Sequence, residues 1–365
     1  MRILIDVLGA PAKSGGMRAY AEELVFAWSE IAPGDELVVI GDEWISEAFG
    51  GLQNLTTIML PAKSTGSRIF SQLARTARAG LRLQCDAMLS VSPIVSPFFP
   101  ASRRFSVIHD WRHLSRPGEF SVAQRLYRCL WRWSAASVKC SFAISEKTLS
   151  ETIEVVPRAN VALAENGRDQ SRRWKVSSEP LYPGRRLVVT FGHHTNKRPE
   201  LVIRALQLLN AELRQSLLLV VLGAEGDYQG QLHDLAVDCG VDEYCVFPGF
   251  TSDHDYQALV AGASVIALVS SDEGFGMPIA EAEYFGARAI VTSDSGVARL
   301  HGGGVIEVEP STVAVATGLR VALESPNART SNESVGPEVR HSWLDTARTI
   351  RTTISQSVWP GSDVI

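Results

Sequence analysis

Short apolar runs alternate with amphipathic stretches along most of the chain, and this alternation predicts parallel β-α units. The first half contains six such runs: RILIDVLG, ELVVIG, AMLSVS, FSVIHD, SFAIS and NVALAENG. The second half starts the alternation again with RLVVTFG, SLLLVVLG, YCVFPG, SVIALVSS, ARAIVTS and GVIEVEP. We therefore expect two doubly wound α/β sheets in one chain.

A polar stretch without periodicity, RDQSRRWKVSSEPLYPGRR, separates the two halves and ends with a Pro-Gly turn. We divide the chain into a first domain (1–168), a linker (169–185), a second domain (186–338) and a final helix with a tail (339–365). Open α/β sheets bind ligands at the carboxyl ends of their strands. The sequence thus predicts a cleft between two domains, with the chemistry in loops that follow strands.

Composition is that of a folded globular protein. The 365 residues suffice for two domains, and 45% of them are hydrophobic and 21% charged. The five cysteines form no C-x-x-C pair, which argues against a disulfide framework and against a zinc site. The start, MRILIDVLGA, is too short for a signal segment, and no run is long enough to cross a bilayer. We expect a cytoplasmic protein.

Charge is distributed unevenly along the chain. Residues 61–140 contain thirteen Lys and Arg and three Asp and Glu, a formal charge of +10, whereas the whole chain carries -5. The remainder is therefore near -15. We expect the two parts to face partners of different charge.

Two glutamates, Glu273 and Glu281, flank a glycine-rich loop that follows the run SVIALVSS, and Glu281 is expected in the first turn of a helix opened by Pro278. Glycines let a ligand approach the backbone, and a helix N-terminus favours an anion. These features outline a site for an anion or a sugar nucleotide. Alternatively, Glu281 only complements the helix dipole and Glu273 is a solvated loop acid.

Lys197 and Arg198 precede another predicted helix, which begins at Pro199 after a run that ends in Gly192. Cations are unfavourable at a helix N-terminus unless an anion compensates them. The pair therefore predicts a phosphate site rather than two solvated basic residues.

The stretch EGFGMPIAEAEYFGARAIVTSDSG, residues 273–296, resembles the E-x7-E segment of the family-four retaining glycosyltransferases with the GT-B fold. LVVTFGHHTNKRPELVIRAL is similar to the phosphate-loop segment of that family. SGGMRAYAEELV, FSVIHD, VFPGFTSDHDYQALVAGASVIALVS and HSWLDTARTI are similar to further segments, in the family's order. The resemblance covers nearly the whole chain and is weakest over residues 50–140. It implies two Rossmann-like domains with a central cleft and a C-terminal helix that crosses back to the first domain.

The resemblance also implies roles for individual residues. Glu281 would bind the ribose hydroxyls of a nucleotide and Glu273 the hydroxyls of a sugar. The implied catalytic residues are His109, Lys197 and Glu273. The residues implied in donor binding are Gly15, Gly16, His193, Arg198, Gly249, Phe250, Gly274, Phe275, Gly276, Met277 and Glu281. His193 departs from the pattern, because many relatives carry an arginine there. Without the resemblance, Gly15-Gly16 indicates only a turn, and a lone histidine is more often structural.

The implied activity is that of a retaining hexosyltransferase of polysaccharide, lipopolysaccharide or glycolipid synthesis. Lys197, Arg198 and His193 would neutralise a departing diphosphate, so neither a metal nor a cofactor is expected beside the nucleotide sugar. GDP-mannose is the first expectation for the donor; UDP-glucose, UDP-N-acetylglucosamine and dTDP-rhamnose stay open. Paired carboxylates also occur in glycoside hydrolases, but a helical glutamate beside a phosphate site disfavours that class.

Basic residues recur at helical spacing in the first domain, as Arg68, Arg75, Arg78 and Arg82 and as Arg125, Arg128, Arg132 and Lys139. Trp131 and other aromatic residues near the second set are of the kind that settles at membrane interfaces. We expect docking on the anionic inner face of the cell membrane and a glycan or lipid-linked acceptor. A solvated basic face with core tryptophans stays open, whereas no recognised module supports nucleic-acid binding.

Two other function classes stay open. A nucleotide-sugar epimerase on the same fold would turn over the donor without an acceptor. A non-catalytic pseudo-transferase subunit is disfavoured because His109, Lys197, Glu273 and Glu281 are all present.

Overall fold

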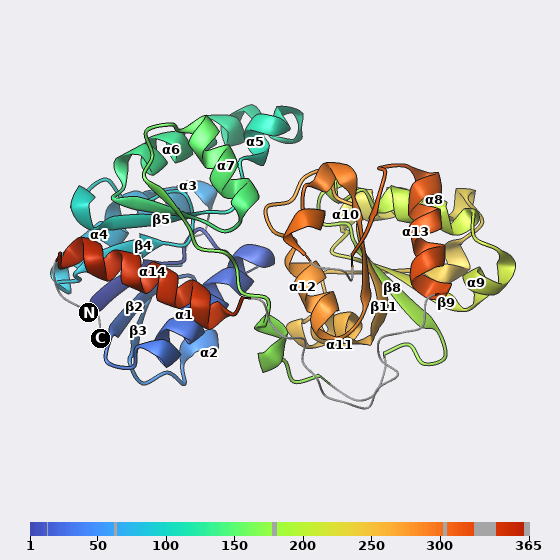
Figure 1. Cartoon of the computed structure of the whole chain (residues 1–365), viewed down its shortest axis with the longest axis horizontal. Coiled ribbons are helices and arrows are strands. Elements are labelled where there is room, and N and C mark those ends of the chain that lie inside the picture. Colours follow the sequence, from blue (N-terminus) through green and yellow to red (C-terminus); the bar gives the residue numbers. More distant parts are fainter. Residues whose placement is uncertain (13, 62–63, 177–180, 302–304, 325–340, 361–365) are drawn as a thin grey trace. The chain divides into compact units, whose positions relative to one another are not determined.

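The structure is a computed structural model of the whole chain and describes residues 1–12, 14–61, 64–176, 181–301, 305–324 and 341–360 (Figure 1). The chain divides into two compact units. The first unit is Met1–Gly167 with His341–Ile365, and the second is Arg168–Arg340.

The first unit contains a parallel seven-stranded sheet of order β3-β2-β1-β4-β5-β6-β7. Its strands are β1 (Arg2–Asp6), β2 (Glu36–Gly41), β3 (Leu55–Met59), β4 (Ala87–Ser90), β5 (Arg104–Ile108), β6 (Cys140–Ala143) and β7 (Val161–Leu163). Its α-helices are α1 (Gly16–Ile31), α2 (Trp44–Phe49), α3 (Thr65–Phe70), α4 (Thr76–Arg82), α5 (Arg112–Ser115), α6 (Val122–Ser137), α7 (Glu146–Val155) and α14 (Trp343–Val358). The six expected strands are confirmed. The sequence analysis missed β3, a half-exposed edge strand whose short run LTTIM contains two threonines.

The second unit contains a parallel six-stranded sheet of order β10-β9-β8-β11-β12-β13. Its strands are β8 (Arg186–Phe191), β9 (Leu217–Leu222), β10 (Cys245–Gly249), β11 (Ala263–Leu268), β12 (Arg288–Thr292) and β13 (Val305–Val308). Its α-helices are α8 (Pro199–Gln207), α9 (Ala211–Gln215), α10 (Gly226–Asp238), α11 (Asp253–Gly262), α12 (Met277–Tyr284) and α13 (Thr312–Glu324). The predicted pair of doubly wound sheets is confirmed.

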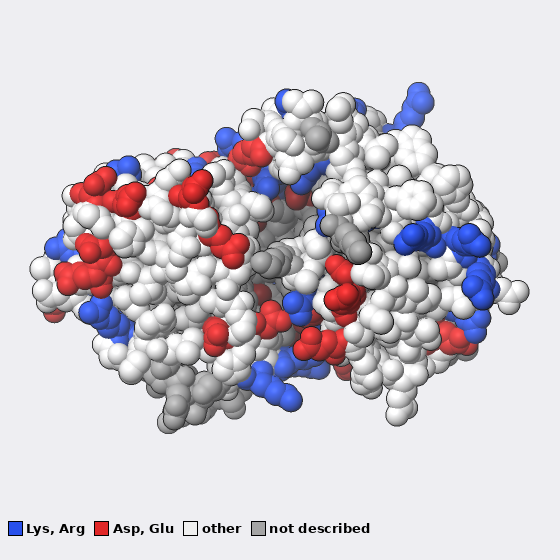
Figure 2. All heavy atoms as spheres, turned by 180° about the vertical axis from the view of Figure 1, so that it is seen from behind, with Lys and Arg blue, Asp and Glu red and all other residues white. Residues whose placement is uncertain are grey.

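Charge is unevenly distributed over the surface, as expected from the sequence. Figure 2 shows basic side chains gathered at the end of the first unit where Figure 1 places α4. On the second unit, Figure 2 shows several groups of acidic side chains. Among the described residues, no helix is both long enough and apolar enough to span a bilayer.

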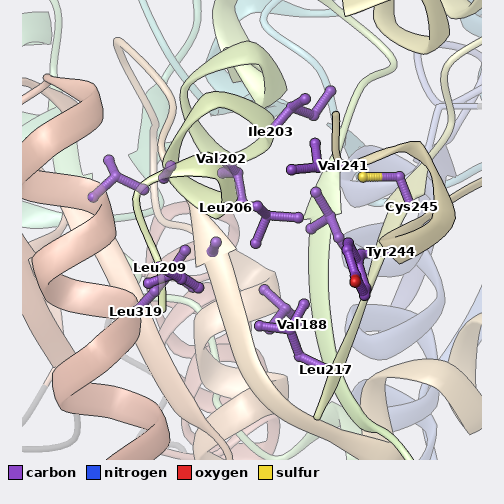
Figure 3. Packing of buried hydrophobic residues seen from close by; sticks show 14 of the residues in the cluster. Val188, Val202, Ile203, Leu206, Leu209, Leu217, Val241, Tyr244, Cys245 and Leu319 are labelled. Atoms are coloured by element: carbon purple, nitrogen blue, oxygen red, sulfur yellow. The ribbon is translucent and has the colours of Figure 1, made fainter. Parts of the chain in front are cut away.

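The second sheet is buried on both faces. All six residues of β9, LLLVVL, are buried, which explains why this strand has no polar alternation. Figure 3 shows Val202 and Leu206 of α8 packed with Val188 of β8 and Leu217 of β9. The apolar side of α8 thus covers one face of the sheet.

The final helix returns to the first unit, as predicted, where it packs along α1 (Figure 1). Trp343 lies against Gly167, where an added Cβ would come within 2.3 Å of the Trp343 nitrogen. Its ring also contacts the buried Tyr20 at 5.2 Å between centroids. Arg351 pairs with the buried Asp35 at 2.8 Å. These contacts fix α14 to the first unit; the predicted central cleft stays a prediction.

The residues expected to form a linker begin inside the second unit. Gln170–Arg173 form a 3-10 turn, and the Gln170 amide donates to the Met277 carbonyl at 3.4 Å. The Trp174 ring contacts Tyr256 and Phe285 at 5.9 and 5.7 Å between centroids. The polar composition of this stretch concealed its packing contacts.

Candidate functional site

The order of the strands in the second sheet reverses between the neighbours β8 and β11, which makes this the switch point of the sheet. From β8 the strands continue to β9 and β10, and from β11 they continue to β12 and β13 on the other side. Loops that leave such a point in opposite directions form a ligand crevice at the carboxyl ends of the strands. The Ser271 N–H donates to the Asn196 carbonyl at 2.9 Å, and the Asn196 amide donates to the Asp272 carbonyl at 3.5 Å. The two predicted donor-binding segments therefore meet at this point.

Lys197 and Glu273 form an ion pair across these two loops, in which the Lys197 ammonium donates to Glu273 Oε1. Their side chains are only 11% and 14% exposed. The Glu273 N–H also donates to the Ser295 carbonyl at 3.1 Å. Each charge is neutralised by the other, which avoids the cost of an unpaired charge in a poorly solvated place.

Arg198, in contrast, points into the protein. Its guanidinium donates to both carboxylate oxygens of Asp294 at 2.9 and 2.7 Å, to Thr292 Oγ1 at 2.8 Å and to the Val269 carbonyl at 2.8 Å. The residue has a left-handed backbone with φ of 49°, a conformation that costs a non-glycine residue about 1–3 kcal/mol. Four hydrogen bonds offset that cost. Arg198 thus holds the loop that carries Lys197, which differs from the expected phosphate contact.

The glycine-rich loop before α12 is held in place by contacts of Phe275 and Gly276 with the rest of the second unit. Gly276 has φ of 80°, and an added Cβ would lie 2.9 Å from Ile279 Cδ1. The Phe275 carbonyl accepts a hydrogen bond from His301 Nε2 at 2.8 Å. The Arg168 guanidinium lies 5.6 Å from the centre of the Phe275 ring. The backbone from Gly274 to Met277, the first residue of α12, is therefore fixed.

Glu281 was expected in the first turn of α12, but the helix begins at Met277 and Glu281 lies in its second turn, where it is only 4% exposed. The Tyr256 hydroxyl donates to Glu281 Oε2 at 2.5 Å. Burial raises the pKa of Glu281 to about 7, and the hydrogen bonds from Tyr256 and Gln170 oppose this rise. Burial also raises the pKa of Tyr256, so its hydroxyl keeps its proton and remains the donor.

Three further predicted donor residues, His193, Gly249 and Phe250, lie at the carboxyl ends of β8 and β10. The His193 ring contacts Phe191 and His194 at 6.4 and 5.0 Å between centroids. Gly249 has φ of 71°, and its carbonyl accepts from the Gly223 N–H at 2.7 Å. Phe250, which directly follows β10, is 47% exposed.

His109 follows β5 in the first unit. Its Nε2 lies 2.7 Å from the Val91 carbonyl and must carry the proton, because a carbonyl only accepts. Burial lowers the pKa of His109, so the ring is neutral near pH 7 and Nδ1 is an acceptor. Gly15 and Gly16 begin α1 and are exposed, and Gly15 has φ of 55°.

The basic residues of the first unit do not share one environment. Arg75, Arg78 and Arg82 are exposed, whereas Arg68 is half-buried and precedes a π-helical turn, Ser71–Arg75, that interrupts the regular α-helical spacing. In α6, Arg125 and Arg132 are exposed. The Arg128 guanidinium lies 4.4 Å from the centre of the Trp131 ring, and both side chains are partly buried.

Sequence reasoning missed the residues that support the site. Tyr256 and Gln170 contact Glu281, His301 holds Phe275, and Asp294 holds Arg198. No local spacing relates these residues to the motifs, because they come from other loops and helices. Within the described ranges, no group of three or more His, Cys, Asp or Glu side chains is placed to hold a metal ion; metal independence stays a prediction.

Comparison with known structures shows the fold first. Across both units the fold is that of the GT-B glycosyltransferases. HepE of Anabaena, solved with UDP and glucose, superimposes with a TM-score of 0.70 at 17% identity over 98% of this chain and all of that one. WaaG, a glycosyltransferase involved in lipopolysaccharide biosynthesis, superimposes with a TM-score of 0.64 at 18% identity, covering 98% of this chain and 97% of WaaG.

Sequence similarity is found for the second unit. Residues 173–337 match the family "Glycosyl transferases group 1", which supports the expected relationship for the second unit. D-inositol 3-phosphate glycosyltransferase of Stackebrandtia nassauensis is 28% identical over 163 residues, which cover 41% of this chain and 37% of that relative. Assignment to family four and the role of the E-x7-E motif stay predictions.

Proposed function

We propose that the protein is a glycosyltransferase that moves a hexose from a nucleotide sugar to a glycan or lipid-linked sugar acceptor. The observation that carries the proposal is the Lys197–Glu273 ion pair. It lies where the strand order reverses between β8 and β11, inside the segment that matches the group 1 family. The names of the similar proteins support it, since HepE was solved with UDP-glucose and WaaG takes part in lipopolysaccharide biosynthesis. An acceptor from polysaccharide, lipopolysaccharide or glycolipid synthesis agrees with those names.

Lys197 neutralises the charge that develops on the departing diphosphate in the proposed reaction. The bond from the sugar's anomeric carbon to the phosphate oxygen breaks, and a bond to the acceptor hydroxyl oxygen forms on the same face. The acceptor proton passes to the departing phosphate oxygen. This retaining course needs no metal and no protein nucleophile. Electrostatic stabilisation of this kind is usually the largest catalytic contribution.

Glu273 binds hydroxyls of the transferred hexose in the same proposal. In the free protein its carboxylate accepts from Lys197. When the donor binds, Lys197 turns to phosphate oxygens and Glu273 accepts from sugar hydroxyls, so each charged group exchanges one strong hydrogen bond for another. The ion pair thus keeps both groups in place until the donor arrives.

Glu281 binds the ribose hydroxyls, and its ionised form is the acceptor for them. Tyr256 already donates to one of its oxygens, which orients the carboxylate. His109 keeps its predicted role as a sugar contact, through an Nδ1 that is free to accept from a hydroxyl when the ring is neutral. Arg198 acts by positioning Lys197 through its bonds to Asp294.

Calorimetric titration with GDP, UDP and dTDP, in the presence of a chelator, tests the donor site. We expect one nucleotide to bind selectively, with GDP tested first because GDP-mannose is the proposed donor, and we expect Glu281→Ala to lose that binding. Binding that requires a divalent cation would remove metal independence from the proposal. If no nucleotide binds at millimolar concentration, the assignment of the donor site is wrong.

A further inference from the structure

One face of α6 is apolar and exposed. Val122, Leu126, Leu130 and Trp133 follow one another at intervals of four, four and three residues, so they share one side of the helix. These side chains are 63%, 67%, 38% and 49% exposed. They extend along ~16 Å of helix. The exposed Cys129 belongs to the same side. We call these five residues the α6 face.

The opposite side of α6 is firmly attached to the first unit. Ala135 is buried, and Ser134 Oγ accepts from the Val95 N–H at 3.0 Å. The Trp131 ring contacts the buried His113 at 5.1 Å between centroids. A capping box between Ser121 and Gln124 closes the N-terminus of the helix. The α6 face therefore belongs to an ordered helix that packs on one side only.

Two of the residues expected in the membrane stripe belong to this attached side. The Arg128 guanidinium lies 4.2 Å from the Phe120 ring centre and 4.4 Å from that of Trp131. It also lies 3.8 Å from a carboxylate oxygen of Asp110. Arg128 and Trp131 therefore support the helix, and the exposed side chains that could enter a membrane are those of the α6 face.

Positive charge flanks the α6 face. Arg125 and Arg132 are exposed beside it, and α6 contains no acidic residue. Burial raises the pKa of Tyr127 in α6, and the positive charge of Arg68 on α3 opposes this rise. Arg75, Arg78 and Arg82 are exposed on the helical turns that follow α3. The basic side chains that Figure 2 shows on the first unit gather where Figure 1 places α4.

The chemistry of the α6 face favours a bilayer over a protein partner. The core of a protein interface is depleted of charged residues, whereas here the exposed Arg125 and Arg132 lie directly beside the apolar residues. Apolar side chains on one side, arginines along a border of that side and a tryptophan near one end are typical of helices that lie in the plane of an anionic membrane. Arginine side chains can reach the lipid phosphates while the leucines enter the acyl region.

We propose that α6 lies in the interface of an anionic lipid bilayer, with Val122, Leu126, Leu130 and Trp133 among the acyl chains and Arg125 and Arg132 at the lipid phosphates. The exposed basic residues of α4 add long-range attraction to the same surface. This inference does not rest on the proposed transferase activity, because the nucleotide site belongs to the second unit. Failure of either proposal leaves the other standing.

Cys129 offers a direct probe, because it is exposed on the α6 face whereas the other four cysteines are buried. An environment-sensitive fluorophore is attached to it, and vesicles of phosphatidylcholine with 30 mol% phosphatidylglycerol are added at low salt. We expect a blue shift and co-flotation of the protein with the vesicles. Vesicles of phosphatidylcholine alone should bind far less protein, and added NaCl should release it.

Two double variants separate the contributions of the apolar residues and of the arginines to vesicle binding. Leu126→Gln with Trp133→Gln should lower the partition coefficient at least tenfold, because both side chains lose apolar burial. Arg125→Gln with Arg132→Gln should lower it by roughly fivefold for each arginine, and only on anionic vesicles. Val313→Gln is the matched control, since Val313 is 68% exposed on α13 in the second unit. An unchanged thermal midpoint shows that each variant is folded.

Three results would overturn the proposal. The first is no vesicle binding at low salt. The second is binding that persists in the α6 variants, which would move the contact to another surface. The third is a blue shift that grows with protein concentration without lipid, which would identify a second copy of the chain as the occupant.

Discussion

Glu273 and Glu281 are separated by seven residues, yet the structure holds them in different ways. Glu273 lies in the loop after β11 and is paired with Lys197. Glu281 lies inside α12, is almost fully buried, and has an uncharged partner, Tyr256. A charged partner stabilises a carboxylate, whereas burial beside a neutral hydroxyl favours the protonated form. The pKa of Glu281 is about 7 because burial outweighs the hydrogen bond from Tyr256.

The comparison shows that a shared motif does not give its two carboxylates the same chemistry. The charge of Glu273 is compensated before any ligand arrives. Glu281 gains or loses a proton near neutral pH, so its readiness to accept from ribose hydroxyls depends on pH. Substitutions at the two positions should therefore differ in size and in pH dependence.

The largest expected effect is on catalysis at the ion pair. Lys197→Ala removes the cation that faces the departing diphosphate, and Glu273→Ala removes the proposed sugar contact and leaves Lys197 unpaired. Each should reduce kcat by about 10²- to 10³-fold. The measurement is release of nucleoside diphosphate from the nucleotide sugar identified by titration.

Arg204→Ala is the control for the ion-pair variants, because Arg204 is an exposed cation on α8, the helix that follows Lys197. Its turnover should stay near that of the wild type. Near-normal turnover in Lys197→Ala or Glu273→Ala, with the protein folded, would contradict the catalytic assignment.

The fold was predictable because its signals are local. Buried parallel strands are short and continuously apolar, so twelve strands could be identified from sequence; β3 was missed because its LTTIM run lies half exposed at a sheet edge. The site was predictable only where glycines and charges follow strands directly, as at Lys197 and Glu273. The inward turn of Arg198 depends on Asp294, which lies ninety-six positions further along the chain.

The α6 face could not be predicted from the sequence for a similar reason. Spacing shows which residues share a side of a helix, but not which side the rest of the protein covers. The regular spacing of Arg125, Arg128 and Arg132 predicted a single basic stripe. Phe120 and Trp131 draw Arg128 toward the protein, and the exposed side is instead apolar.

The next largest effect is on stability through Glu281. The folded-state pKa of about 7 is above the ordinary value of 4.5, so the folded second unit holds a proton that the unfolded chain releases. The stabilisation from this proton is fully present below pH 4.5 and is lost as pH rises through 7. Glu281→Gln, which cannot ionise, should therefore gain stability relative to the wild type by about 3 kcal/mol between pH 4.5 and pH 8.

Urea unfolding of both proteins across this pH range provides the measurement. Trp174 is the one tryptophan between residues 168 and 340. Subtracting the tryptophan fluorescence of the same protein with Trp174→Phe therefore leaves the signal for unfolding of the second unit. The free energy of unfolding of Glu281→Gln must be compared with that of the wild type at each pH, because burial also raises the pKa of Asp6 in the first unit to about 7. A stability difference that does not change with pH would show that Glu281 is already ionised in the folded state.

The smallest effect concerns Tyr256, whose hydrogen bond lowers the pKa of Glu281 against the larger effect of burial. Because the ionised carboxylate is the proposed ribose acceptor, nucleotide affinity should fall by up to tenfold for each pH unit below about 7. Tyr256→Phe should move this fall to higher pH and weaken binding at pH 7 by about fivefold, the equivalent of one hydrogen bond. Glu281→Gln should bind weakly and lack the pH dependence that Glu281 contributes. If Tyr256→Phe weakens binding equally at every pH, the tyrosine contributes to the shape of the site and not to the charge of Glu281, and the contrast between the two glutamates would be one of burial alone.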